Sequence, residues 1–156
     1  MIAQLRRSLW SGVLLGLGFV AFIDEAVFHQ LLHWHHFYDK STTGIGLASD
    51  GLFHAFSWLA TIGGSFLYAH LRRIGELNRK AWLGGIWAGG GTFQLYDGTI
   101  QHKLMRLHQI RYVDEVYLYD WTWNVVAGVM IVVGLALFRR SGQEPRAAGS
   151  GAHGSS

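Results

Sequence analysis

The chain of 156 residues contains no cysteine and a single proline, and only 15% of its residues are charged. The absence of cysteine excludes disulfides, zinc–thiolate sites and thiol chemistry. Half of the residues are apolar, and this composition indicates a membrane protein rather than a soluble domain. The net charge of +3 is explained by where the basic residues lie, so we expect a lipid bilayer as partner and no nucleic acid.

Four segments are long enough to cross a bilayer as helices, which takes about 20 residues each. Glycines are frequent inside these segments and allow membrane helices to approach closely. The sequence therefore predicts an all-α fold, an integral membrane four-helix bundle over residues 1–140, followed by a disordered cytoplasmic tail over residues 141–156. The expected spans are Leu9–Leu32, Gly51–Leu71, Ala81–Gln101 and Trp121–Phe138.

Basic residues predict the orientation of these spans, because they are enriched on the cytoplasmic side. One group of basic residues precedes the first span, a second lies in the connection between the second and third spans, and a third follows the fourth span. Both termini should therefore be cytoplasmic, in a multi-pass protein of the plasma membrane, with the loops His33–Asp50 and Lys103–Asp120 facing outward. The basic residues are Arg6, Arg7, Arg72, Arg73, Arg79, Lys80, Arg139 and Arg140.

The two halves of the chain share a polar pattern, D-x4-H-x-L-x3-H, that begins at Asp24 and again at Asp97. In the following spans the pattern D-x3-(H/N) occurs at Asp50 and at Asp120. The chain is therefore interpreted as two tandem helical hairpins, over about 9–71 and 81–138, related by a pseudo-twofold axis along the membrane normal. The paired residues are Asp24, His29, Leu31, His35, Asp50 and His54 in the first half, and Asp97, His102, Leu104, His108, Asp120 and Asn124 in the second.

Ionisable groups at membrane depth usually face a partner or a cavity, because burying them in lipid costs about 2.5–3.5 kcal/mol each. Imidazole and carboxylate ligands together suit Zn, Fe or Cu. Spacings of four residues on an α-helix predict a metal site near the outer face, formed by Glu25, His29, His33, Asp50, His54 and His102. Supporting positions are expected at Asp24, Asp97, His35, His108, Asp120 and Asn124.

One spacing does not fit a straight helix. Asp24 and His29 are five residues apart and would point about 140° away from each other on an α-helix. Either the helix is kinked or broken near these residues, or Asp24 makes a different contact.

The predicted function is a membrane protein that binds a transition metal, as a metal-dependent redox enzyme or as a metal-handling protein. Two alternatives remain. The polar residues could set helix registry in a structural or assembly subunit of a larger membrane complex or homo-oligomer, or His54 and His102 could hold a b-type haem.

Three stretches, "FIDEAVFHQLLHWHHFYD", "SDGLFHAFSW" and "FQLYDGTIQHKLMRLHQIRY", resemble a family of bacterial predicted membrane proteins that is catalogued as a domain of unknown function. The resemblance covers about Trp10 to Phe138. It implies a four-span integral membrane protein of the bacterial inner membrane and supplies no activity.

Overall fold

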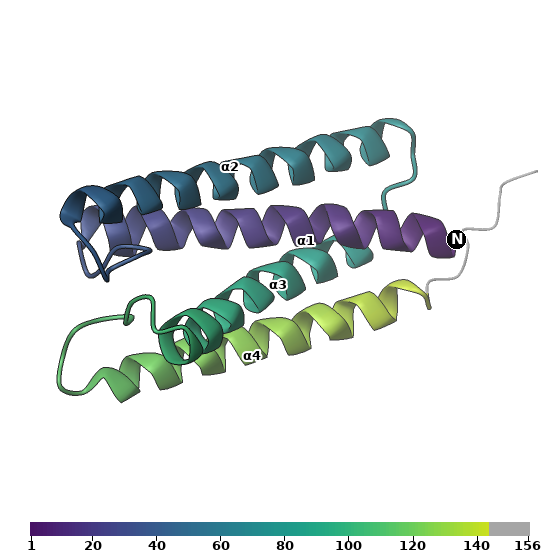
Figure 1. Ribbon diagram of the computed structural model, residues 1–156. Helices are drawn as coiled ribbons and strands as arrows, with labels where there is room; N and C mark the ends of the chain where they lie inside the picture. The colour runs from purple at the N-terminus through teal and green to yellow at the C-terminus, as the bar shows by residue number, and fades with distance from the viewer. Residues whose placement is uncertain (144–156) are drawn as a thin grey trace, which may run out of the picture.

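The structure is a computed structural model that describes residues 1–143, and the described residues are helical or lie in short connections. Four helices run side by side (Figure 1): α1 (Ile2–Asp24), α2 (Thr43–Arg73), α3 (Arg79–Tyr96) and α4 (Val116–Ser141). Two π-helices extend α1 and α3 at the same end of the molecule: η1 (Glu25–Leu31) and η2 (Asp97–Leu104). The all-α prediction is confirmed. Ser141 belongs to α4, and the rest of the predicted tail, from residue 144 on, lies outside the described residues.

Local sequence explains where the helices begin and end. The side chains of Thr42 and Asn78 cap the first turns of α2 and α3 by accepting hydrogen bonds from the amides of Ile45 and Ala81. At the end of α2, Gly75 adopts a left-handed φ of 70°, which glycine tolerates best. These signals set the short connection between α2 and α3 at the end of the molecule opposite the π-helices.

The α1 and α3 helices form the centre, with α2 packed on the outer side of α1 and α4 on that of α3. Glycines make the central contact possible. A Cβ atom on Gly12 would lie 2.0 Å from the carbonyl oxygen of Trp82, and one on Gly85 would lie 2.2 Å from that of Leu9. The predicted role of these glycines, close helix approach, is thus confirmed at the α1–α3 crossing.

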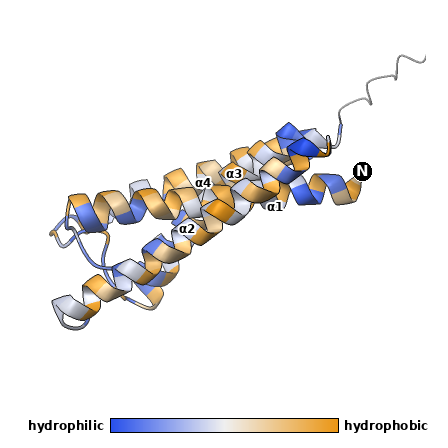
Figure 2. Ribbon diagram, turned by 90° about the horizontal axis from the view of Figure 1, so that it is seen from above, coloured by the Kyte–Doolittle hydropathy of each residue, from blue (hydrophilic) through white to orange (hydrophobic). Residues whose placement is uncertain are grey.

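Apolar side chains of the helices mostly face outward. Leu52, Phe66 and Val132 are 75%, 73% and 67% exposed. Among the described residues, fourteen polar or charged side chains are buried but only seven apolar ones. Figure 2 shows apolar residues along the helices and hydrophilic segments toward the two ends. A surface this apolar is unfavourable in water and indicates contact with lipid.

Two helical segments, Ile2–Leu31 and Val116–Ser141, are long and apolar enough to cross a membrane by length and composition. α2 and α3, which the sequence also predicts as spans, do not meet the same test among the described residues. Both helices contain several Gly, Ser and Thr residues, some of which, such as Gly64 in α2 and Gly85 in α3, pack against the backbone of α1.

Candidate metal centre

The two π-helices decide how the polar residues point. In a π-helix the backbone amide bonds to the carbonyl five residues earlier, as Leu32 does to Val27 and Met105 does to Ile100. Residues five apart therefore lie nearly above one another. Asp24 and His29 meet for this reason, with 3.7 Å between Asp24 Oδ2 and His29 Nε2. Of the two explanations predicted for this spacing, the irregular helix is the one observed.

Each π-helix is followed by a residue in the left-handed region, His33 with φ 50° and Arg106 with φ 52°. Such a φ is uncommon for residues other than glycine. It turns the chain back, so that the following segment crosses the end of the bundle instead of continuing outward. Two histidines, His35 and His108, are carried into the interior by this turn and are 6% and 2% exposed.

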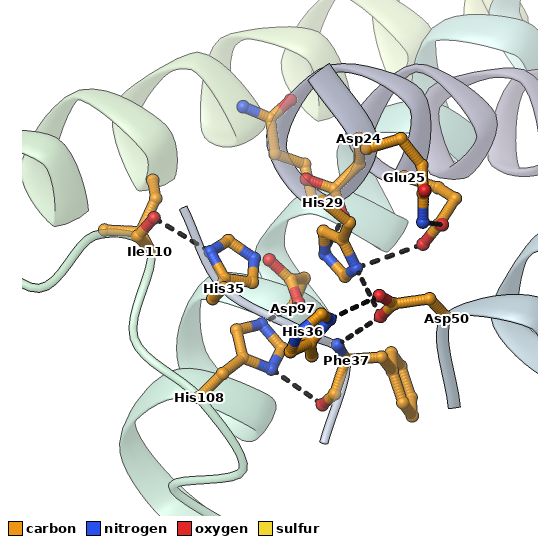
Figure 3. A network of polar contacts seen from close by, with 12 residues as sticks. Asp24, Glu25, His29, His35, His36, Phe37, Asp50, Asp97, His108 and Ile110 are labelled. Carbon is orange, nitrogen blue, oxygen red and sulfur yellow. Dashed lines mark hydrogen bonds and ion pairs between the residues drawn. The ribbon is translucent and has the colours of Figure 1, made fainter. Parts of the chain in front are cut away.

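His29 is held by carboxylates from two helices (Figure 3). Its Nδ1 donates to Asp50 Oδ1 at 3.0 Å and lies 3.0 Å from Glu25 Oε2. Asp50 also accepts from His36 Nδ1 at 2.7 Å and from the Phe37 amide at 2.7 Å. With Nδ1 fixed in this way, the Nε2 atom of His29 lies on the side of Asp24.

His35 and His108 are held by each other's loops. His35 Nδ1 donates to the Ile110 carbonyl at 3.0 Å, and His108 Nδ1 donates to the Phe37 carbonyl at 2.9 Å (Figure 3). The two rings stack with their centroids 4.4 Å apart and 6° between their planes. The His29 ring centroid lies 4.5 Å from that of His35, so three imidazoles form one compact group.

The protonation of His35 suits it to metal binding. Burial lowers the pKa of His35 to about 2, because a positive charge is unfavourable in the buried site. The ring is therefore neutral at neutral pH. Because its Nδ1 carries the proton that is donated to Ile110, its Nε2 keeps the lone pair that a metal ion requires.

The nitrogen atoms offered by His29, His35 and His108 all lie within 4.8 Å of one another. The Nε2 atoms of His29 and His108 are buried and have no hydrogen-bond partner. Ligating histidines typically donate the other ring N–H to a carboxylate or a backbone carbonyl, and all three rings here do so. All three rings are therefore held through Nδ1 in the way that ligating histidines are held.

A second group lies beside the first and shares His108 with it. His102 Nε2 is 3.1 Å from Asp97 Oδ2, and His108 Nε2 is 3.5 Å from Asp97 Oδ1. The ligand atoms of these three residues also lie within 4.8 Å of one another. Asp120 Oδ1 lies 4.0 Å from His102 Nδ1, and its other oxygen forms an ion pair with Lys103. Carboxylate and imidazole ligands from both halves of the chain thus meet at one place.

The structure does not bring His33 and His54 into either group. His33 is exposed at the left-handed turn. His54 Nε2 accepts from Trp58 Nε1 at 3.0 Å, and its ring packs at 5.5 Å from that of Phe22. The expectation that these two histidines join the cluster is therefore corrected. The prediction for His33 assumed that residues four apart from Glu25 through His29 to His33 share one face of an α-helix. The chain leaves the α-helical path at Glu25, so this assumption does not hold there.

The other predicted residues lie in or near the cluster. Glu25, His29 and Asp50 form a third set of ligand atoms within 4.8 Å of one another. Asn124 lies at the edge and bonds to the Asp120 carbonyl. One contributing residue was not predicted: His36 bonds to Asp50, and its position beside His35 at the membrane surface gave no signal that separated it from an interfacial residue.

The fold and the cluster define a helical membrane protein with buried histidines and carboxylates at one end. The chain belongs to the family described as predicted membrane protein (DUF2243), whose model matches residues 11–141. The resemblance noted from the three sequence stretches is thereby confirmed. No curated protein and no solved structure matches the chain.

Proposed function

We propose that this protein crosses the membrane four times and holds a transition metal ion, Zn, Fe or Cu, at the outward end of the helices through His29, His35 and His108. The observation that carries the proposal is the common orientation of the three rings. Each Nδ1 is fixed by a carboxylate or a carbonyl. The opposing Nε2 atoms of His29 and His108 are buried without a hydrogen bond and face the carboxylates of Asp24 and Asp97 at 3.7 Å and 3.5 Å. Leaving such polar atoms unpaired is unfavourable by about 1–3 kcal/mol each, and a bound ion would remove that penalty.

The four-span arrangement is supported by the surface of the helices. α2 and α3 are less apolar than α1 and α4, yet their outward faces carry large apolar side chains such as Leu59, Phe66 and Leu83. The start of α1, the α2–α3 connection and the end of α4, where the basic residues are concentrated, lie at the end opposite the metal cluster (Figure 1). By the positive-inside rule the cluster then faces the outer side of the membrane.

We also infer that the chain arose by duplication of a hairpin, and we place the metal cluster on the pseudo-twofold axis. The support is a recurring offset of 73 positions. The donor His35 corresponds to His108, and its acceptor Ile110 corresponds to Phe37, so the two bonds exchange partners between the halves. An experimental structure should superpose α1–η1–α2 on α3–η2–α4 by rotation about the membrane normal, and an inverted relation would refute the inference.

The ion would have room for a further ligand. Three imidazoles leave a fourth coordination position open, as in catalytic zinc sites. The carboxylates of Asp24 and Asp97 are close enough to orient a water molecule there. We therefore favour a reactive metal, in a metal-dependent enzyme, over an ion that only stabilises the fold.

Binding requires a small closure of the site. Two nitrogen atoms that share one zinc ion lie at most about 4.2 Å apart, because each zinc–nitrogen distance is about 2.0–2.1 Å. The donor atoms must therefore approach from separations of up to 4.8 Å. Small side-chain rotations supply such movements.

The test is elemental analysis of the full chain, purified without an affinity tag after growth with added Zn, Fe or Cu. We expect about one ion per chain, because three histidines form one site. His35→Ala and His108→Ala should lose most of the ion, whereas His54→Ala, a histidine at the same end of the protein but outside the cluster, should keep it. Size-exclusion chromatography and circular dichroism identify variants that fold.

Two results would refute the proposal, and each would support one of the alternatives. Metal-free wild-type protein, or equal metal content in the folded His108→Ala and His54→Ala variants, would leave the cluster as a device of helix registry in a structural or assembly subunit. A Soret band in the purified protein would indicate haem instead.

A further inference from the structure

A cavity of about 570 Å³ lies beside the metal cluster, between α2 and α3. Its volume falls in the range of about 300–1,000 Å³ that is typical of small-molecule sites. Its wall is almost wholly apolar and aromatic. Residues at its mouth, Leu52, Phe56 and Tyr96, are 75%, 50% and 47% exposed on the outer surface of the helices. In a membrane-spanning arrangement this mouth opens sideways into the lipid.

The inner end of the cavity reaches the cluster. Phe53 lines the cavity, and its ring centroid lies 5.7 Å from that of His29. Phe37 also lines it, stacks on Phe53 at 5.0 Å, and offers its carbonyl to His108. One layer of aromatic rings therefore separates the cavity from the histidines.

A residue that lines the cavity has a buried acceptor without a donor, which a small rotation of its amide would turn toward the cavity. Gln101 lines it, is only 2% exposed, and its Oε1 is buried with no hydrogen-bond partner. A buried acceptor in an apolar environment requires a donor. No other side chain among the described residues fills that role for this oxygen, so the partner fits a hydroxyl or N–H group of a bound molecule.

A second cavity of about 440 Å³ lies at the corresponding place between α4 and the first half of the chain. Two of its polar side chains bond across the cavity wall: Gln94 Nε2 donates to the Trp123 carbonyl at 3.2 Å, and Trp123 Nε1 donates to the Gln94 carbonyl at 2.9 Å. Phe28 occupies the position equivalent to Gln101. Among the described residues, a buried acceptor without a partner belongs to the lining of the first cavity, and none belongs to the lining of the second.

We propose that the first cavity binds a lipid-phase molecule with a long apolar chain and a hydroxyl group, whose hydroxyl donates to Gln101 Oε1 beside the cluster. The apolar wall would hold the chain, and the mouth between α2 and α3 would admit it from the bilayer without passage through water. This site goes beyond the metal centre and rests on the proposed membrane arrangement. If the metal is reactive, the hydroxyl end of such a molecule lies nearest to it.

The test uses the full chain in phosphatidylcholine vesicles and two photoactivatable probes. One is hexadecanol with a diazirine in its chain, and the other is the methyl ether of the same compound, which cannot donate a hydrogen bond. Crosslinked peptides are identified by mass spectrometry. We expect the alcohol to label peptides of the first cavity about tenfold more than the ether does, since one hydrogen bond to a buried acceptor has about that effect on binding.

Variants of the cavity residues test whether the labelling by the alcohol comes from the first cavity. Gln101→Leu should bring alcohol labelling down to the level of the ether. Thr92 and Thr122 are exposed threonines that line the first and the second cavity, respectively. Thr92→Trp should fill the first cavity and remove the labelling, whereas Thr122→Trp should leave it unchanged.

The metal content of each sample, measured in parallel, keeps this proposal separate from the metal centre. Equal labelling by the alcohol and the ether in the wild type, or equal labelling of both cavities, would show that the first cavity holds only bulk acyl chains. Metal retained in such samples would refute the lipid site but leave the proposed metal centre supported. Conversely, selective alcohol labelling of metal-free protein would support the lipid site while removing the metal from its function.

Discussion

Replacing Gly12 by alanine tests how closely α1 and α3 must approach. The new Cβ atom would lie 2.0 Å from the Trp82 carbonyl oxygen, 2.9 Å from the Ile86 amide nitrogen and 3.0 Å from Gly85 Cα. All three are backbone atoms, so no side-chain rotation relieves the contact and α3 as a whole must move. Overpacking of this kind costs about 1–3 kcal/mol. Alanine gains about 1 kcal/mol over glycine in helix propensity, which offsets part of it.

A matched control removes the propensity effect from the comparison. Gly63 lies within α2, and a Cβ atom there would meet nothing within 4 Å. Gly63→Ala should therefore be neutral or raise the free energy of unfolding by up to about 1 kcal/mol. Gly12→Ala, at the upper end of the overpacking range, should lower it by about 2 kcal/mol, which gives a difference of about 3 kcal/mol between the variants.

The assay is equilibrium unfolding in mixed micelles of a mild detergent and dodecyl sulfate, followed by the fluorescence of the seven tryptophans. Gly85→Ala, whose Cβ atom would lie 2.2 Å from the Leu9 carbonyl oxygen, should behave like Gly12→Ala. If Gly12→Ala unfolds at the same or a higher dodecyl sulfate fraction than Gly63→Ala, the central helices are not packed as closely as described, and the argument from backbone contact is refuted.

Three further predictions concern the cluster and the topology. Asp50→Asn removes the charge that holds three donors and should lower metal affinity about 10–100-fold in a competition with a chromophoric chelator, and unchanged affinity would contradict its positioning role. Insertion of one alanine after Ala26 should place His29 six residues after Asp24, turn it away from Asp24 by about 100° and abolish metal binding while the elution volume stays the same; retained metal would exclude η1 as the orienting element. A reporter fused at the C-terminus should be cytoplasmic and one inserted near Thr43 external, and the opposite labelling would reverse the proposed orientation.

The sequence was sufficient to predict the helices, because long apolar segments without proline have few other solutions in a membrane. The internal pattern was also informative about the site. Asp24, His29 and His35 and their counterparts in the second half, which share the pattern D-x4-H-x-L-x3-H, are the residues that meet in the cluster. The similarity between the halves therefore located the site better than helical spacing did.

Spacing failed where the helix type changed. His33 was predicted because it lies four residues after His29. In the structure His33 follows the end of η1 and itself adopts the left-handed φ of 50°, so its side chain points outward and His35 turns inward instead. His54 failed for another reason. The rotation of α2 about its own axis is set by contacts such as that of Gly64 with the Leu15 backbone, and these depend on tertiary packing that no short motif encodes.

The exchange of hydrogen bonds between the two outer loops also has a consequence for biosynthesis. His35 depends on a carbonyl that follows it by 75 residues, and His108 on one that precedes it by 71. A ribosome that has inserted only the first hairpin has produced His29 and His35 but not the Ile110 carbonyl that orients the His35 ring. Neither hairpin alone can present the three rings together. In the proposed orientation, the cluster would therefore become competent to capture an ion only after the last loop had crossed the membrane. Metal loading would then report that insertion is complete.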